Sequence, residues 1–544
     1  MLNVFKNYPL SSICLLIAIV LLPNLETIQV TIMEARNFIT AREMIQDNHW
    51  LLTTMNGEAR YEKPPLPTWL TAISALLFGV KSVFGMRLPA IIMIMVLACY
   101  SYKLSKTILK SSAHSIINTL VLITSFYVIG ITIEAPWDIF THGFMMVAIY
   151  HLFTFLNSEH THWKPAVFTA FFIGCSILSK GPVSFYALLL PFLLAYGFSF
   201  KYKKIKPKVL PILTILVLAI AIGGWWYFYV RLEDPETFAA ITSKETGNWT
   251  SYNVRPFYYY WSFFTQSGLW TIPAFISLLY PYLKTRVINL QAYKFTLLWT
   301  IFAVVLLSLI PEKKSRYLMP VLIPLALNIG FYIEYLIRTF KTLTDKRETI
   351  PVYFNFGLIA LIGIIAPFVL FFQFKTQLST NLFPFLLFAL IVFVLGLAIL
   401  WQLLKKEMTK VFLLTTTFFG AIFLFGLPLA KTFTSTNFKP ISGLLDENTK
   451  SNIRLYNINH ISPEAIWQYG EKIPRITKKD NVFGFPTDSE FVVLANDISQ
   501  KDQDNISKTY IIEQLGTYDL NESEPNSKQY KDRLISKYYY FKKK

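Results

Sequence analysis

Long apolar stretches separated by short polar segments make up most of this chain. About thirteen of them are long enough for a helix to cross roughly 30 Å of hydrocarbon. They lie near residues 10–30, 85–105, 114–133, 138–157, 165–180, 182–199, 209–230, 265–283, 294–310, 317–337, 352–373, 380–404 and 411–430. A shorter apolar run at 66–77 follows a proline-rich turn, which favours a helix lying at the membrane interface. The pattern predicts an all-α polytopic membrane protein with about 13 transmembrane helices.

Lysine and arginine in the short loops predict the orientation of these spans, because cytoplasmic loops carry an excess of both. The positive residues fall on alternate loops, which we assign to the cytoplasm together with the N-terminus. They are Lys103, Lys106, Lys110, Lys201, Lys203, Lys204, Lys206, Lys208, Lys284, Arg286, Arg338, Lys341, Lys346, Arg347, Lys405, Lys406 and Lys410. The segments 31–67 and 231–264 and the C-terminal tail are then expected on the outer side.

The polar tail, 432–544, is predicted to be a second domain after a membrane core at 1–431. Short apolar strands such as IRLYNI, EFVVLAND and TYIIEQL alternate with polar turns in it, which indicates a small soluble α/β extracytoplasmic domain. No nucleophile, phosphate-loop or metal-ligand spacing occurs in the tail, so we interpret it as a module for packing or for acceptor recognition.

Composition narrows the function classes. The chain is 53% hydrophobic and only 15% charged, with a formal net charge of +18. Most of that positive charge lies in predicted cytoplasmic loops next to anionic headgroups, so nucleic acid is not an expected partner. The three cysteines, Cys14, Cys99 and Cys175, lie in predicted spans, which argues against a disulfide framework or a cysteine-based metal site.

The outer segment 31–67 is unusually rich in charge for a connecting loop. Glu34 and Arg36 lie at the outer end of the first span, and Glu62 and Lys63 belong to the turn YEKPP. Carboxylates can act as bases here and cations can hold phosphate. A structural alternative stays open, since a glutamate at a helix start is often a capping or surface residue.

Two further polar residues lie at the outer ends of spans. Asp138, in EAPWDIF, is a carboxylate at membrane depth, which is costly enough to indicate function, although aspartate is also a good helix N-cap. Lys180, in LSKGP, precedes a Gly-Pro pair that ends the helix; a snorkelling lysine is the alternative.

The motif PEKKSRYLMP places Lys313, Lys314, Arg316 and Tyr317 at another outer helix end. Positive charge on this side runs against the orientation bias, so something anionic is expected to compensate it.

Outer carboxylates and cations on one leaflet suit a reaction at a lipid-linked phosphate. The cations would stabilise the departing phosphate, and a carboxylate would take the proton of an acceptor hydroxyl. That chemistry is glycosyl transfer.

The order MEAR, AREM, YEKPP, an aspartate after the third span, SKGP and RYLMP resembles the polyprenyl-phosphate-sugar-dependent GT-C glycosyltransferases. The likeness extends to about residue 430. Its nearest branch is the lipid A aminoarabinose transferases, which are similar to protein O-mannosyltransferases in their membrane core. In the family, the first outer loop usually begins with an Asp-Glu pair followed by arginine, and here Met33 stands in place of the aspartate.

The resemblance implies roles for particular residues. Glu34 and Asp138 would be the catalytic carboxylates, either of them serving as the base. The segment NVRPFYYYW resembles the family's Arg-Pro-Phe run and contributes a further cation. The expected substrate-binding residues are Arg36, Glu62, Lys63, Lys180, Arg255, Arg316 and Tyr317. The outer loop carrying Lys244, Glu245 and Trp249 would close over the site.

The resemblance further implies an inverting transfer on the outer face of a bacterial inner membrane. The donor would be a polyprenyl-phosphate-linked sugar, either 4-amino-4-deoxy-L-arabinose or a hexose, and the acceptor a lipid A-like glycolipid or a protein. No particular cofactor is assigned. A divalent cation stays open, since His49 and His142 could bind one with Glu62 or Asp138.

A transporter or flippase of lipid-linked glycans is the competing class. Such proteins place ionisable groups near the bilayer midplane, whereas the charges here gather at one leaflet. A polymerase or ligase that joins lipid-linked glycans would share the donor chemistry and the external site.

Overall fold

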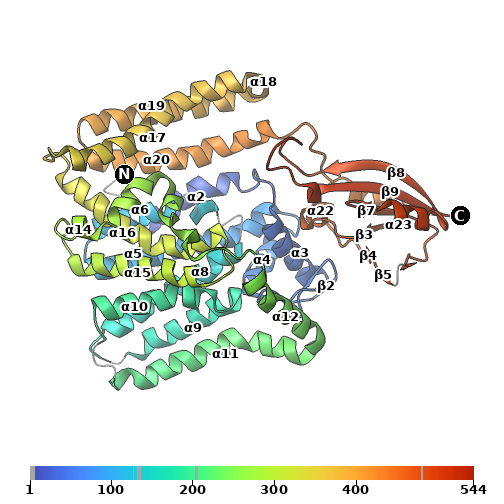
Figure 1. The fold of residues 1–544 in the computed structure, drawn as a ribbon, viewed down its shortest axis with the longest axis horizontal. Helices are drawn as coiled ribbons and strands as arrows, with labels where there is room; N and C mark the ends of the chain where they lie inside the picture. The colour runs from blue at the N-terminus through green and yellow to red at the C-terminus, as the bar shows by residue number, and fades with distance from the viewer. Residues whose placement is uncertain (1–6, 126–127, 131–135, 161, 203–205, 480–481) are drawn as a thin grey trace. The chain divides into compact units, whose positions relative to one another are not determined.

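The computed structural model describes residues 7–125, 128–130, 136–160, 162–202, 206–479 and 482–544 (Figure 1). The chain divides into two compact units. The first, here called the helical unit, comprises Met1–Thr27, Tyr61–Pro67 and Arg87–Leu429. The second, here called the mixed unit, comprises Ile28–Arg60, Thr68–Met86 and Ala430–Lys544. Two short segments near the N-terminus therefore belong with the C-terminal tail.

Helices form almost all of the helical unit (Figure 1). Its α-helices are α2 (Pro9–Leu21), α5 (Val83–Leu109, which starts in the mixed unit), α6 (Ser112–Ile123), α8 (Pro136–Asn157), α9 (Trp163–Lys180), α10 (Leu190–Ser199), α11 (Val209–Glu233), α12 (Pro235–Ser251), α13 (Thr271–Ser277), α14 (Tyr280–Leu283), α15 (Leu290–Leu309), α16 (Met319–Thr339), α17 (Lys346–Gln373), α18 (Lys375–Leu378), α19 (Leu382–Leu404) and α20 (Met408–Ala421).

Eight helical stretches among the described residues are long and apolar enough to cross a membrane. They are Val83–Leu109, Trp137–Asn157, Lys206–Glu233, Leu290–Leu309, Ser315–Thr339, Lys346–Gln373, Lys375–Leu404 and Met408–Phe433. The prediction of a multi-pass helical membrane protein is confirmed.

Where the structure describes them, the other predicted stretches form helices that are shorter than these eight or are broken. In 265–283, the 3-10 helix η5 (Phe263–Trp270) leads into α13 and α14, and Gly268 has φ 64° and ψ −113° inside it. In 182–199, the π-helical turn η2 (Phe185–Leu189) precedes α10. The stretch 114–133 lies partly outside the described residues. The total of about 13 spans therefore stays a prediction.

Glycine contacts bring neighbouring helices of the helical unit close together. A Cβ added to Gly223 of α11 would lie 3.1 Å from the carbonyl oxygen of Gly174 in α9. On α19, a Cβ added to Gly396 would lie 2.8 Å from the carbonyl oxygen of Ala360 in α17 and 3.0 Å from the carbonyl carbon of Gly363. Small residues let membrane helices pack at backbone distance. Helix α8 in turn packs along α9, so the ends of these helices are well fixed.

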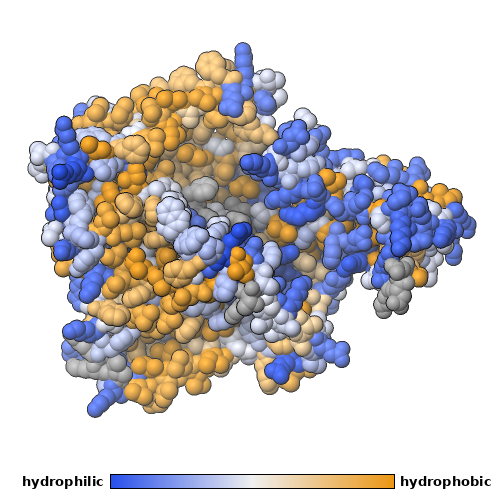
Figure 2. Space-filling view, viewed as in Figure 1, coloured by the Kyte–Doolittle hydropathy of each residue, from blue (hydrophilic) through white to orange (hydrophobic). Residues whose placement is uncertain are grey.

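The surface of the helical unit is mostly apolar, and it appears largely orange in Figure 2. Large hydrophobic side chains on α11, α17 and α19 are exposed; Phe372 is 79% and Phe383 77% exposed. A soluble protein rarely leaves so continuous an apolar surface in water, whereas a membrane helix presents it to lipid tails.

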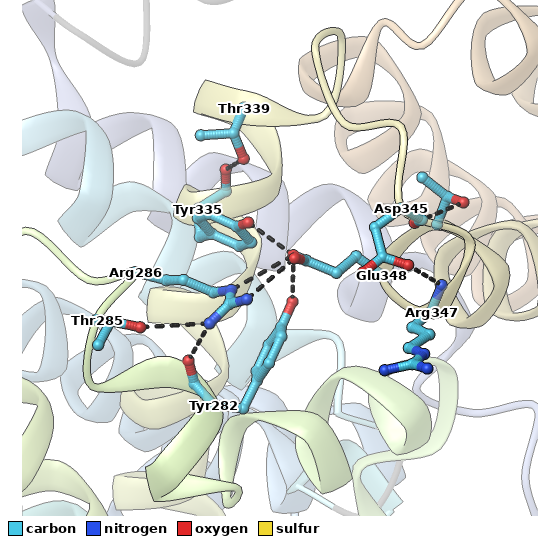
Figure 3. A network of polar contacts seen from close by, with 9 residues as sticks. Tyr282, Thr285, Arg286, Tyr335, Thr339, Asp345, Arg347 and Glu348 are labelled. Carbon is cyan, nitrogen blue, oxygen red and sulfur yellow. Dashed lines mark hydrogen bonds and ion pairs between the residues drawn. The ribbon is translucent and has the colours of Figure 1, made fainter.

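A network centred on Glu348 joins three helical segments of the helical unit (Figure 3). The carboxylate of Glu348, at the start of α17, accepts hydrogen bonds from the hydroxyls of Tyr282 at 2.8 Å and Tyr335 at 2.7 Å. Arg286 donates to it at 3.0 Å. Because the partners come from α14, α16 and the loop after α14, the network fastens the ends of these segments together.

The mixed unit contains a five-stranded sheet with the strand order β4-β3-β7-β9-β8. Strand β3 runs parallel to β4 and β7, whereas β9 runs antiparallel to β7 and β8. The predicted α/β character of the tail is confirmed. The unit's elements are α3 (Ile32–Gln46), β1 (Thr54–Met55), β2 (Glu58–Ala59), α4 (Leu66–Phe78), α21 (Leu444–Lys450), β3 (Leu455–Ile458), α22 (Pro463–Tyr469), β4 (Arg475–Ile476), β5 (Lys478–Lys479), β6 (Val482–Phe483), β7 (Glu490–Ala495), α23 (Gln500–Ile506), β8 (Tyr510–Asp519) and β9 (Ile535–Lys543).

One hydrophobic core of the mixed unit combines N-terminal and C-terminal residues. Helix α3 packs on α22, and the rings of Phe38 and Trp467 meet edge to face with centroids 5.2 Å apart. Ala72 and Ala75 of α4 contribute to the same core. The predicted helix at 66–77 is α4; its place at a membrane interface stays a prediction.

Candidate active site

A buried ion pair joins the start of α8 to the end of α9. Asp138 lies in the first turn of α8 and is only 3% exposed. The ammonium of Lys180, the last residue of α9, contacts its Oδ1 atom. Within the described part of the chain, Asp138 Oδ2 is buried and accepts no hydrogen bond. A carboxylate with one oxygen held and the other unpaired can accept a proton or a hydrogen bond from a bound molecule.

Tyr317 and Arg316 lie next to this pair. Both belong to the 3-10 helix η6 (Ser315–Leu318) that leads into α16. The Nζ atom of Lys180 lies 5.4 Å from the centroid of the Tyr317 ring, and the charge of Arg316 acts on Asp138. The structure therefore brings together residues that the sequence suggested from three separate motifs: Asp138, Lys180, and the pair Arg316 and Tyr317.

Glu312 extends the cluster, and the sequence analysis did not select it. Its Oε1 atom accepts a hydrogen bond from the Tyr317 hydroxyl at 3.1 Å and lies 2.6 Å from the Nζ atom of Lys314. The expected anionic compensation of the PEKKSR motif is thus supplied, for Lys314, by the motif's own glutamate. In the sequence, the glutamate next to two lysines in this motif was the feature that could have indicated the pair.

The segment around Arg255 runs beside this motif through backbone contacts. Val254 and Glu312 form an antiparallel bridge, and the Arg255 amide donates to the Pro311 carbonyl at 3.2 Å. Lys313 donates from its Nζ atom to the Arg255 carbonyl at 3.0 Å, and burial lowers the pKa of Lys313. The Arg255 residue itself is exposed, although its backbone is close to the motif.

His142, which the sequence leaves open as a metal ligand, belongs to α8. It lies one helical turn after Asp138, and its Nδ1 atom shares a hydrogen bond with the hydroxyl of Ser184. Among the residues that the structure describes, no group of three or more histidine, cysteine, aspartate or glutamate side chains could hold a metal ion. His49 belongs to the mixed unit, where its Nδ1 atom is 2.9 Å from the Thr54 hydroxyl. The histidine pair therefore has no metal-binding arrangement in the described chain.

The YEKPP element contacts the start and the middle of α12. The Tyr61 hydroxyl donates to Asp234 Oδ2 at 3.0 Å, and Lys63 Nζ lies 3.5 Å from Glu245 Oε2. Burial and Asp234 raise the pKa of Tyr61 to about 12. Hydrogen bonds from Thr237 and Tyr61 lower the pKa of Asp234. These contacts tie the predicted phosphate-binding turn to the outer helix.

Glu62 has a buried carboxylate oxygen, Oε2, with no hydrogen-bond partner in the described chain. The predicted closing loop carries α12, which includes Lys244 and Glu245. The side chain of Trp249 lies outside the described residues. In this turn Lys63 has an ion-pair partner, whereas the Oε2 atom of Glu62 has no hydrogen-bond partner among the described residues.

Glu34 and Arg36 lie in α3 of the mixed unit. Glu34 is 1% exposed, and its Oε2 atom accepts a hydrogen bond from the Thr31 amide at 3.0 Å. The Thr31 hydroxyl accepts from the Glu34 amide in return, which completes a capping box. Arg36 accepts a hydrogen bond from Arg60 through its backbone carbonyl at 3.0 Å. At least one carboxylate oxygen of Glu34 therefore has the capping role that the sequence left open.

Neighbouring charges of the same segment support the fold of the mixed unit. The buried carboxylate of Glu43 accepts hydrogen bonds from the Thr54 hydroxyl at 2.6 Å and from the Asn56 amide at 2.6 Å. Asn56 and Gly57, with φ of 58° and 78°, form the tight turn of the β1–β2 hairpin. Arg42 is buried and donates to the Glu471 carbonyl at 3.2 Å. Much of the local charge density is structural.

The helical unit, with acidic and basic side chains gathered at helix ends, defines a multi-pass membrane protein with a polar site between its helices. Residues 62–226 match the family model described as dolichyl-phosphate-mannose-protein mannosyltransferase. The matched range contains Glu62, Lys63, Asp138 and Lys180.

Two curated relatives illustrate the sequence likeness. The undecaprenyl phosphate-alpha-4-amino-4-deoxy-L-arabinose arabinosyl transferase 1 of Proteus mirabilis is 24% identical over 317 residues, which cover 56% of this chain and 55% of that protein. An uncharacterised protein of Aquifex aeolicus is 24% identical over 289 residues, 52% of this chain and 55% of that protein. The chain spans about half the length of these relatives.

Among solved structures, the ArnT of Cupriavidus metallidurans bound to undecaprenyl phosphate has the same fold. The TM-score is 0.66 at 13% sequence identity, and the alignment covers 99% of this chain and 98% of that chain. The family match and the full-length fold likeness agree with each other. Residues 62–226 are thus similar in sequence to the mannosyltransferase family, and the whole chain has the fold of this ArnT.

Proposed function

We propose that this protein is an integral-membrane, inverting glycosyltransferase. It moves a sugar from a polyprenyl-phosphate donor to a glycolipid or protein acceptor on the outer face of a bacterial inner membrane. The observation that carries the proposal is the cluster of Asp138, Lys180, Arg316 and Tyr317 at helix ends. The family match and the fold likeness support it.

The proposed reaction is an in-line displacement at the anomeric carbon of the donor sugar. The acceptor oxygen forms a bond to that carbon, the bond to the phosphate oxygen breaks, and its electron pair leaves with the polyprenyl phosphate. Lys180 and Arg316 stabilise the charge that develops on the phosphate. A carboxylate takes the acceptor proton. Asp138 suits this role because its Oδ2 atom has no partner in the described chain, and Glu34 is the second candidate.

The other predicted residues would bind the donor or the acceptor. We assign Lys63, Arg36 and Arg255 to anionic groups of the substrates and Glu62 and Tyr317 to hydroxyl or amino groups. Lys63 already has a partner in Glu245 on α12, so a phosphate at Lys63 would exchange with that carboxylate. This exchange would couple donor binding to a movement of α12.

We further propose which sugar and acceptor the protein uses and how it is oriented in the membrane. The name of the Proteus mirabilis relative favours 4-amino-4-deoxy-L-arabinose as the sugar, with a hexose as the alternative. The acceptor that we propose is a lipid A-like glycolipid, with a protein as the alternative. The membrane core, 1–431, would carry about 13 spans with a cytoplasmic N-terminus, and 432–544 would be extracytoplasmic. A reporter fused after Lys544 that is active only outside the cytoplasm tests this placement.

The direct test of function is transfer of radiolabelled sugar from a panel of polyprenyl-phosphate donors to membrane extracts. The intact protein is compared with Asp138→Asn, Lys180→Ala and Glu34→Gln, and with Glu407→Gln as a control from the Lys341–Glu407 pair on a predicted cytoplasmic loop. Donor-dependent transfer that is lost in site variants and kept in the control is the expected result. Labelled lipid that crosses vesicles without transfer would instead indicate a flippase.

A further inference from the structure

Glu312 holds two groups of the candidate site at once. Its Oε1 atom accepts the Tyr317 hydroxyl at 3.1 Å and pairs with Lys314 Nζ at 2.6 Å. The Lys314 ammonium also lies 3.3 Å from the Tyr317 hydroxyl oxygen. The side chains of Glu312 and Lys314 are 12% and 24% exposed, so water only partly screens their interaction.

The backbone around Glu312 is fixed on both sides. Glu312 forms the antiparallel bridge with Val254. Lys313 donates from its amide to the Asn253 carbonyl at 3.1 Å, and the Tyr260 hydroxyl donates to the Lys314 carbonyl at 3.1 Å. These contacts fix the point from which the Glu312 side chain extends toward Lys314 and Tyr317. Any anion that binds Lys314 must share it with Glu312 or displace it.

The charge balance of the cluster makes this competition matter. Lys180 is paired with Asp138 and Lys314 with Glu312, while the charge of Arg316 acts on Asp138. Three cations and two carboxylates leave a small net positive charge. A ligand with one negative charge suits such a site. A second negative charge on the ligand is repelled by Glu312 and is no longer balanced by the small excess of cations.

The two polyprenyl lipids of the proposed reaction differ in this respect. The donor is a phosphodiester with one negative charge, whereas the product is a phosphomonoester with roughly 1.5 to 2 negative charges near neutral pH. Repulsion from Glu312 grows with the charge of the ligand, so it weakens product binding more than donor binding.

We propose that Glu312 is a positioning residue that favours product release. It holds Lys314 and the Tyr317 hydroxyl in the empty site and makes the site discriminate against the phosphomonoester relative to the phosphodiester. This inference rests on the proposed function. Glu312 acts through Lys314, Tyr317 and its own charge and takes no proton in the reaction.

The test is a binding measurement on the full chain in lipid nanodiscs with two probes of one polyprenyl chain length. One probe is the polyprenyl monophosphate and the other is its methyl diester. Glu312→Gln keeps an oxygen that can accept the Tyr317 hydrogen bond but removes the charge. We expect it to tighten monoester binding by about tenfold and diester binding by about threefold.

Two matched variants complete the design. Glu312→Asp keeps the charge, and Glu407→Gln removes a lysine-paired carboxylate from a predicted cytoplasmic loop; both are expected within about twofold of the intact protein. In transfer assays, Glu312→Gln should lower KM and kcat together, because the product stays bound. A residue needed only for folding would not lower KM.

The outcomes separate the two levels of the proposal. If the intact protein binds neither lipid, the proposed function fails and this inference falls with it. If it binds both, but Glu312→Gln leaves the monoester-to-diester affinity ratio unchanged or weakens both probes, the role of Glu312 is overturned while the function stands. Glu312→Ser, a second neutral variant, provides the same comparison if the glutamine variant does not fold.

Discussion

The ammonium of Lys180 lies on the carboxylate of Asp138, and each charge sits at the end of the helix that favours it. Asp138 is in the first turn of α8, where the helix dipole stabilises an anion, and Lys180 is in the last turn of α9, where it stabilises a cation. The pair thus fastens two packed helices at the point where the proposed chemistry takes place.

Breaking this pair should cost stability as well as activity. Lys180→Met leaves Asp138 buried without its partner, so we expect a loss of about 3 kcal/mol in the free energy of unfolding. The double variant Asp138→Asn/Lys180→Met should recover most of that stability, because neither charge remains, yet should not transfer sugar. Thermal unfolding in detergent and the transfer assay measure the two effects. Recovery of transfer in the double variant would contradict a catalytic role for the pair.

Glu34 allows its structural and chemical roles to be separated. Glutamine can replace glutamate in a capping box, so Glu34→Gln should unfold at the temperature of the intact protein. If Glu34 rather than Asp138 is the base, transfer should fall by about 100-fold or more. Glu34→Ala should lose stability and transfer together. Thr31→Ala, which removes the cap but keeps the carboxylate, is the control; full transfer in Glu34→Gln would leave Asp138 as the base.

Close helix packing predicts a strong effect at Gly396. An alanine Cβ there would meet backbone atoms of Ala360 and Gly363 at 2.8 to 3.0 Å, and backbone cannot move aside as a flexible side chain can. We expect Gly396→Ala to destabilise the protein by about 1 to 3 kcal/mol. Gly357→Ala on α17, where a Cβ meets nothing within 4 Å, should be neutral. Equal melting temperatures for the two variants would show that α17 and α19 pack less closely.

Lys208 should stabilise the far end of α8. Its Nζ atom donates to the carbonyls of Phe155, Leu156 and Ser158 at 2.7 to 2.9 Å. Lys208→Met keeps the apolar stem but leaves these carbonyls without that donor, with an expected loss of about 1 to 3 kcal/mol. The exposed Lys206, changed to methionine, should have little effect. Amide hydrogen exchange in the last turn of α8 measures the stability of this helix end directly, whereas global unfolding does not.

The sequence predicted the parts of the molecule that local pattern determines. Apolar length identified the membrane helices, and charges at helix ends identified Asp138 and Lys180, whose side chains meet in the structure. Local pattern did not predict the break at Gly268, because hydropathy records composition and not backbone conformation. It also could not assign Arg42 and Glu43, since their partners depend on a hairpin and on residue Glu471.

Glu312 illustrates a different limit. The sequence showed an acidic residue among cations, but a pair of neighbouring opposite charges is common on any protein surface. Its contacts with Tyr317 and Lys314 follow from the turn in the chain at η6 and from the bridge to Val254. Which of several nearby charges meet is decided by such tertiary contacts.

The packing of Phe38 against Trp467 also bears on how the protein is made. Helix α3 leaves the ribosome long before α22, which covers it. The segment that carries Glu34 and Arg36 must therefore wait for the synthesis of α22 before its core is complete. A chain terminated before α22 would insert its membrane helices but would leave α3 without its packing partner. Folding of α3 therefore depends on the synthesis of α22.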